Sequence, residues 1–96
     1  MPKGYWIASI TTKDAERYKD YISAARPIFE KYGGKPLVRG GAFEAPEGEA
    51  CDRNVVLEFD SFEQAQACYN SIEYQEAAKI RQEASTGRLI IIRGVE

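Results

Sequence analysis

The sequence contains no histidine among its 96 residues. Histidine is the side chain that changes charge near neutral pH, and it is a common general base, transition-metal ligand and haem ligand. Its absence excludes Ser-His-Asp and Cys-His catalysis and also haem binding through a histidine ligand. Any chemistry in this chain must therefore depend on carboxylates, tyrosines, arginines, lysines or a group supplied from outside.

Long hydrophobic runs and clusters of basic residues are missing as well. No apolar stretch approaches the roughly 18–20 residues that span a bilayer, and no signal-peptide hydrophobic segment follows the first residues. The 13 lysines and arginines are scattered among 15 acidic residues, and the net charge is −2. Because no basic run is present to neutralise phosphates, we expect neither a nucleic-acid nor a membrane partner, and we expect a cytoplasmic location.

The two cysteines fit neither a metal-binding nor a redox spacing. Cys68 follows the helical spacing of Ala65 and Ile72, which favours a small buried side chain, and Cys51 lies in an acidic segment that disfavours a thiolate. The acidic residues between positions 44 and 52 match no calcium-loop spacing. We therefore expect no bound metal and no cofactor.

Periodicity divides the chain into alternating strands and helices within one domain, residues 1–96. Strands are predicted at residues 5–11, 37–43, 54–59 and 89–92, with a first helix from a cap at Thr12 or Asp14. Gly33 and Gly87 are predicted to end the helices. Ser61 and Gln64 have capping-box spacing, and Ser71 is predicted to begin a further helical segment.

The resulting order, β-α-β-β-α-β, is typical of an α+β, ferredoxin-like fold. It predicts a four-stranded antiparallel sheet with the helices on one face and the first and third strands in the centre. The predicted strands carry apolar residues on both faces, although an antiparallel sheet with one free face normally alternates. We therefore expect a second copy to cover the free face, so that a homodimer packs sheet to sheet into an α/β barrel.

A series of short segments resembles one protein family. These are GG at 33–34, LVRGG at 37–41, EG at 47–48, VVLEF at 55–59, ACYNS at 67–71, EYQ at 73–75 and Arg81. In this order and at these spacings, the chain resembles domain of unknown function 1330. The resemblance covers nearly the whole chain and implies the fold of the dimeric α/β barrels, but it implies no characterised activity.

Arg39 and Glu58 are the first candidate site residues. Each lies among apolar residues on a predicted strand, and the two strands should be neighbours, so their opposite charges are expected to pair. In one interpretation they form a structural ion pair. In the other, Arg39 anchors an organic anion and Glu58 is the candidate catalytic base.

Tyr69, Ser71, Tyr74 and Arg81 form the second group of candidates. Tyr74 and Arg81 lie two helical turns apart on one face, close to the break at Ser71. In the structural interpretation, Ser71 caps a helix and the tyrosines pack with a hydroxyl at the rim. In the functional one, phenol and guanidinium groups bind a small polar ligand at the mouth of a pocket.

The leading hypothesis is a dimeric protein that binds a small anionic organic molecule in a pocket near Arg39. Two alternatives stay open: a non-catalytic structural or interaction domain whose barrel interior is fully packed, and a cofactor-free small enzyme of the isomerase or monooxygenase type.

Overall fold

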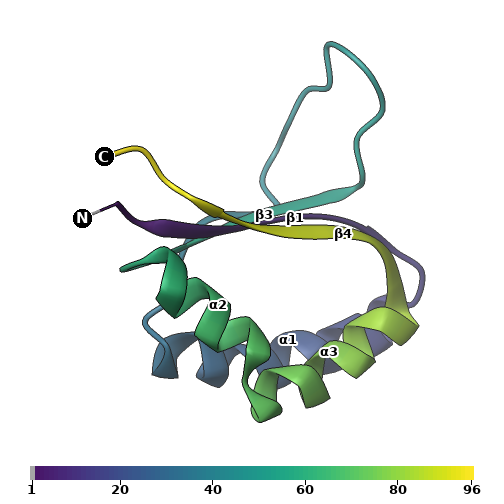
Figure 1. Cartoon of the computed structure of the whole chain (residues 1–96). Helices are drawn as coiled ribbons and strands as arrows, with labels where there is room; N and C mark the ends of the chain where they lie inside the picture. The colour runs from purple at the N-terminus through teal and green to yellow at the C-terminus, as the bar shows by residue number, and fades with distance from the viewer. Residues whose placement is uncertain (1) are drawn as a thin grey trace.

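Four strands form one antiparallel sheet, and three helices pack on one of its faces (Figure 1). The computed structural model describes residues 2–96. In chain order the elements are β1 (Gly4–Thr12), α1 (Ala15–Lys31), β2 (Lys35–Arg39), β3 (Arg53–Phe59), α2 (Phe62–Asn70), α3 (Ile72–Ala84) and β4 (Ser85–Arg93). The strand order β2-β3-β1-β4 places β1 and β3 in the centre and confirms the predicted ferredoxin-like topology. Within the described residues, no helix is both long enough and apolar enough to cross a bilayer.

Alternation along β1 defines a core face and an outer face of the sheet. Trp6 and Ile10 point toward the helices and are only 2% and 1% exposed, whereas Ile7 between them is 38% exposed on the opposite face. Residues paired across an antiparallel sheet lie on the same face. The pairing of Ile7 with Val56 and Ile90 therefore assigns these two residues to the outer face as well.

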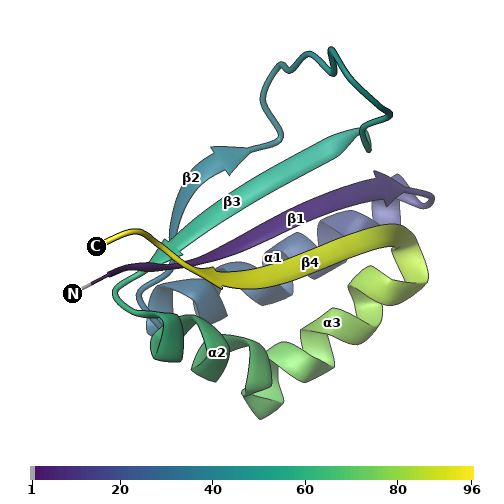
Figure 2. The ribbon, with the colours of Figure 1, turned by 45° about the horizontal axis from the view of Figure 1, so that its top comes forward.

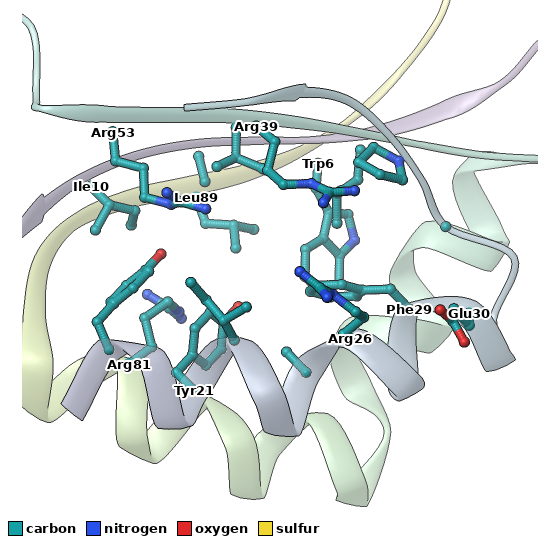
Figure 3. Close-up of a pocket in the computed structure, with 18 residues that line it drawn as sticks. Trp6, Ile10, Tyr21, Arg26, Phe29, Glu30, Arg39, Arg53, Arg81 and Leu89 are labelled. Atoms are coloured by element: carbon teal, nitrogen blue, oxygen red, sulfur yellow. The ribbon is translucent and has the colours of Figure 1, made fainter. Parts of the chain in front are cut away.

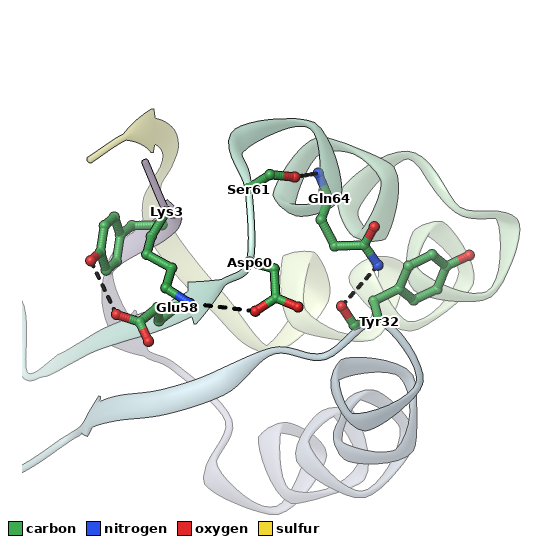
Figure 4. A network of polar contacts seen from close by, with 7 residues as sticks. Lys3, Tyr32, Glu58, Asp60, Ser61 and Gln64 are labelled. Carbon is green, nitrogen blue, oxygen red and sulfur yellow. Dashed lines mark hydrogen bonds and ion pairs between the residues drawn. The ribbon is translucent and has the colours of Figure 1, made fainter. Parts of the chain in front are cut away.

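Side-chain caps begin the three helices. The Asp14 carboxylate accepts a hydrogen bond from the Arg17 amide at 3.1 Å, and the Ser61 hydroxyl accepts one from the Gln64 amide at 3.0 Å. The predicted capping box is only half formed, because the Gln64 side chain instead donates to the Tyr32 carbonyl at 3.0 Å (Figure 4). This bond ties the start of α2 to the end of α1.

Strand β2 is shorter than predicted. It covers Lys35–Arg39 rather than residues 37–43, and its pairing with β3 is irregular between Pro36 and Val38. Leu37 is the extra residue between these two pairings, and it breaks the regular alternation of side chains along β2. The following loop, residues 40–52, stands away from the sheet on the side opposite the helices (Figures 1 and 2).

Gly87 was predicted to end the helical region, and this prediction is wrong. Helix α3 ends at Ala84, the chain enters β4 directly at Ser85, and Gly87 pairs with Ile10 inside that strand. Its φ of +150° is a conformation that side chains disfavour, and a Cβ here would collide with the Ser9 carbonyl oxygen. The glycine is thus needed for close approach within the sheet.

Replacing this glycine should destabilise the protein. We expect Gly87→Ala to lower the free energy of unfolding by roughly 2–4 kcal/mol, because both backbone conformation and space are unsuitable for a Cβ. Urea unfolding followed by circular dichroism measures the loss. The matched control is Gly41→Ala in the loop, where a Cβ would meet nothing within 4 Å, and a change within about 0.5 kcal/mol is expected. Equal effects of the two substitutions would contradict the assignment.

Candidate functional site

A cavity of about 160 Å³ lies between the core face of the sheet and helix α1 (Figure 3). Its inner wall consists of buried apolar and aromatic side chains: Trp6, Ile10, Tyr18, Tyr21, Ala25 and Leu57. Its rim consists of exposed residues from α1 and β2: Arg26, Glu30, Pro36 and Arg39. The cavity is therefore apolar inside and charged at its opening.

Four arginines, each from a different element, surround this cavity (Figure 3). Arg26 comes from α1, Arg39 from β2, Arg53 from β3 and Arg81 from α3. Among residues 2–96, none of these guanidinium groups forms an ion pair with a carboxylate. Glu30 is the only acidic residue in the described lining. The site thus carries a local excess of positive charge in a protein of net charge −2.

Arg53 and Arg81 lie deepest of the four. Both are half-buried, and in the described part of the chain the Nε atom of each is buried without a hydrogen-bond partner. The guanidinium carbon of Arg53 lies 5.5 Å from the centre of the Tyr18 ring, and that of Arg81 lies 6.0 Å from the Tyr21 ring. These cation–π contacts position the two side chains but leave their Nε donors free.

The tyrosines of the cavity are neutral hydrogen-bonding groups. Burial raises the pKa of Tyr18 and raises that of Tyr21 well above its ordinary value. The Tyr21 hydroxyl also shares a 2.8 Å hydrogen bond with the hydroxyl of buried Tyr74. Burial alone would lower the pKa of Arg81, but the nearby phenols, Tyr74 foremost, raise it above its usual range. At neutral pH the inner wall therefore offers positive charge and O–H donors, but no phenolate base.

Arg39 and Glu58 do not form the predicted pair. Arg39 is paired with Val55 and lines the cavity, whereas Glu58 is paired with Tyr5 on the outer face. There the Glu58 carboxylate accepts a hydrogen bond from the Tyr5 hydroxyl at 3.1 Å (Figure 4), which raises the pKa of Tyr5. The β2 irregularity and the alternation of β3 place the two charges on opposite faces of the sheet.

Of the second group of candidates, Arg81 alone lines the cavity. Tyr74 is fully buried behind the lining, where its hydroxyl bonds that of Tyr21 and its ring packs against Trp6 with centroids 4.9 Å apart. The centroid of the Tyr69 ring lies 5.8 Å from that of Trp6. Ser71 caps α3: its hydroxyl accepts from the Tyr74 amide at 3.1 Å and donates to the Cys68 carbonyl at 2.7 Å.

Sequence reasoning missed Arg26, Arg53 and the cavity tyrosines. Arg53 could have been found from alternation, since it shares a face of β3 with Val55 and Leu57. Arg26 lies one helical turn after Ile22, beside the apolar stripe of α1. Cys68, by contrast, is fully buried, and desolvation raises its thiol pKa to about 12, so this cysteine is not a nucleophile.

The fold and the comparisons with known proteins agree on the class of protein. The topology defines a ferredoxin-like α+β domain. The family model for "Domain of unknown function (DUF1330)" matches residues 3–95, and the chain belongs to this family. No protein with a curated description matches the chain significantly.

Several solved structures share the fold. A protein of unknown function from Rhodopseudomonas palustris is 24% identical, with a TM-score of 0.76 over 99% of this chain and 84% of that chain. SnoaB from Streptomyces nogalater, a cofactor-independent oxygenase, is 9% identical, with a TM-score of 0.67 over 100% and 96%. A dimeric protein of unknown function and ferredoxin-like fold from Bacteroides fragilis is 16% identical, with a TM-score of 0.55 over 95% of both chains.

The capping role of Ser71 can be tested separately from any ligand. We expect Ser71→Ala to lower the free energy of unfolding by about 0.5–2 kcal/mol, the usual cost of losing a helix N-cap. Ser23→Ala, at an exposed position inside α1, is the control and should change stability by less than about 0.5 kcal/mol. Chemical unfolding measures both. An unchanged stability of the Ser71 variant would contradict the role of its hydroxyl as a cap.

Proposed function

We propose that the protein binds a small organic anion in the cavity between the sheet and α1. The observation that carries this proposal is the convergence of four arginines from four elements on one cavity, none of them paired with a carboxylate in residues 2–96. Like charges in a partly desolvated space repel each other, and an anion relieves that repulsion. It also supplies acceptors for the buried Nε donors of Arg53 and Arg81.

The inner wall favours an organic anion over a bare inorganic ion. Trp6, Ile10 and Leu57 present apolar surface, with which an inorganic ion would make no favourable contact. Ligand pockets usually combine such surface with a few polar groups that orient the ligand. The presence of this cavity also disfavours the alternative in which the interior is fully packed.

A cofactor-free enzyme is the second candidate. One structural neighbour is described as a cofactor-independent oxygenase, although a sequence identity of 9% supports only a shared fold. Guanidinium groups around a cavity suit the stabilisation of an enolate. Proton removal beside a carbonyl would then fall to Glu30 at the rim, because Glu58 lies on the outer face and the buried tyrosines are neutral.

Anion binding should appear as thermal stabilisation. We expect carboxylates from a metabolite panel to raise the melting temperature. A ligand at a concentration of 100 times its dissociation constant raises the free energy of unfolding by about 2.7 kcal/mol. Arg53→Ala should lose most of this effect, because Arg53 is half-buried in the cavity lining and pairs with no carboxylate within residues 2–96.

The control is Arg17→Ala, which removes an arginine of α1 that pairs with Glu83 away from the cavity lining. This variant should respond to ligands as the wild type does. A screen in which no carboxylate or phenolic compound raised the melting temperature would overturn the proposed function.

The outer face supports a homodimer. Four apolar residues of this face are 38–48% exposed: Ile7, Val38, Ile90 and Ile92. Ile7 pairs with Ile90 on one side and with Val56 on the other, and Val56 pairs in turn with Val38. A contiguous apolar patch on a sheet is normally covered. The loop at residues 40–52 rises on this side of the sheet (Figure 1), and its residue Phe43 is 51% exposed.

A charge at the centre of this face should separate the subunits. We expect the wild type to sediment as a dimer at micromolar concentration and Ile7→Glu to sediment as a monomer, since pairing would bury the new carboxylate in both copies. Ile72→Glu is the matched control, because Ile72 is 83% exposed at the start of α3, away from the outer face. A wild type that sediments as a monomer would refute the sheet-to-sheet dimer.

A further inference from the structure

We propose that the cavity accepts an aromatic carboxylate the size of benzoate, with the carboxylate between Arg53 and Arg81 and the ring toward Trp6. This inference rests on the proposed function and adds the class of ligand and its orientation. It makes Arg53 and Arg81 the binding pair, and Arg26 and Arg39 contacts at the opening.

The size of the cavity limits the ligand. Its volume is about 160 Å³. An apolar cavity of about 150 Å³ in another protein holds one benzene molecule. A single six-membered ring therefore fills most of the space, and fused ring systems exceed it unless they extend through the opening.

The inner end of the cavity provides the site for the charge. Arg53 reaches down from β3 and Arg81 reaches up from α3 at the same end of the cavity, next to Ile10 and Leu89 (Figure 3). The Arg53 guanidinium lies 5.5 Å from the centre of the Tyr18 ring and that of Arg81 lies 6.0 Å from the centre of the Tyr21 ring. These two rings are neighbours, with centroids 5.4 Å apart. A carboxylate here would accept from the two buried Nε atoms that lack partners in the described structure.

The other end of the cavity provides the site for the ring. Trp6 and Phe29 line it, and their rings meet edge to face with centroids 5.3 Å apart (Figure 3). Flat aromatic surfaces in this arrangement favour a further aromatic ring over a flexible chain. Arg26 and Arg39 at the rim are exposed to water, so their charges are screened and contribute less to binding.

The fluorescence of Trp6 tests the proposal directly, since it is the only tryptophan in the chain and lines the cavity. We expect benzoate to change this fluorescence saturably. Its neutral isostere benzamide should bind at least about tenfold more weakly, because a hydrogen bond to a charged group is lost. Succinate, an aliphatic dicarboxylate, should also bind more weakly than benzoate.

Arginine variants test the orientation. Arg53→Gln and Arg81→Gln should each weaken benzoate binding at least about tenfold, whereas Arg26→Gln, the control at the rim, should change it less than about threefold. Circular dichroism checks that each variant is folded. If a glutamine variant fails to fold, the corresponding lysine variant replaces it, because lysine retains the charge but lacks the Nε donor.

The outcomes separate the two proposals. Tighter binding of succinate than of benzoate, with the same dependence on arginines, overturns the aromatic ligand and leaves anion binding intact. Equal losses in the Arg26 and Arg53 variants overturn the orientation. Absence of binding by every carboxylate overturns both this inference and the proposed function.

Discussion

Trp6 is the residue through which the layers of this protein contact one another. Its indole nitrogen donates a 2.9 Å hydrogen bond to the Ala65 carbonyl, which ties β1 to α2. Its ring also packs against Phe29 of α1, with centroids 5.3 Å apart, and against Tyr74 of α3, 4.9 Å apart. A buried tryptophan with a satisfied N–H fixes the position of each element it contacts. Trp6 therefore contacts all three helices from the sheet and also lines the cavity.

The cavity exists because α1 rests on α3 more than on the sheet. Ala77 and Ala78 of α3 are almost fully buried, and small side chains allow helices to approach closely. The hydroxyl bond between Tyr21 and Tyr74 joins the same two helices. Between α1 and the sheet, by contrast, Ala25 of α1 and Ala8 of β1 line the cavity with side chains too small to fill it. The space is thus a consequence of where large and small residues are distributed.

Local signals in the sequence predicted most of the fold, because strand alternation, helix caps and the β-α-β-β-α-β order depend on residues near one another. Ser61 and Ser71 cap their helices as predicted. The predictions that failed concern contacts between residues that are distant in the sequence. The need for Gly87 arises from the approach of Ser9 across the sheet, which no local pattern contains.

The candidate site was less predictable for the same reason. The predicted pairing of Arg39 with Glu58 rested on their strands being neighbours, but the irregular pairing of β2 and the alternation of β3 place the two charges on opposite faces. The other cavity arginines come from elements that meet only after folding. A single arginine on a strand is visible in the sequence, but four arginines around one cavity are a property of the topology.

The arrangement of these arginines is difficult to explain by stability alone. Arg53 and Arg81 lie against aromatic rings, which offsets part of the cost of burying charge, yet their Nε atoms lack partners in the described residues. Apolar residues of similar volume would pack there at no such cost, and buried charges often contribute less to stability than apolar replacements do. The retention of two such groups beside an apolar cavity therefore supports the proposed anion binding. Arg53 and Arg81 are half-buried whereas Arg26 and Arg39 are exposed, so the proposed anion is favoured between Arg53 and Arg81, where water competes less.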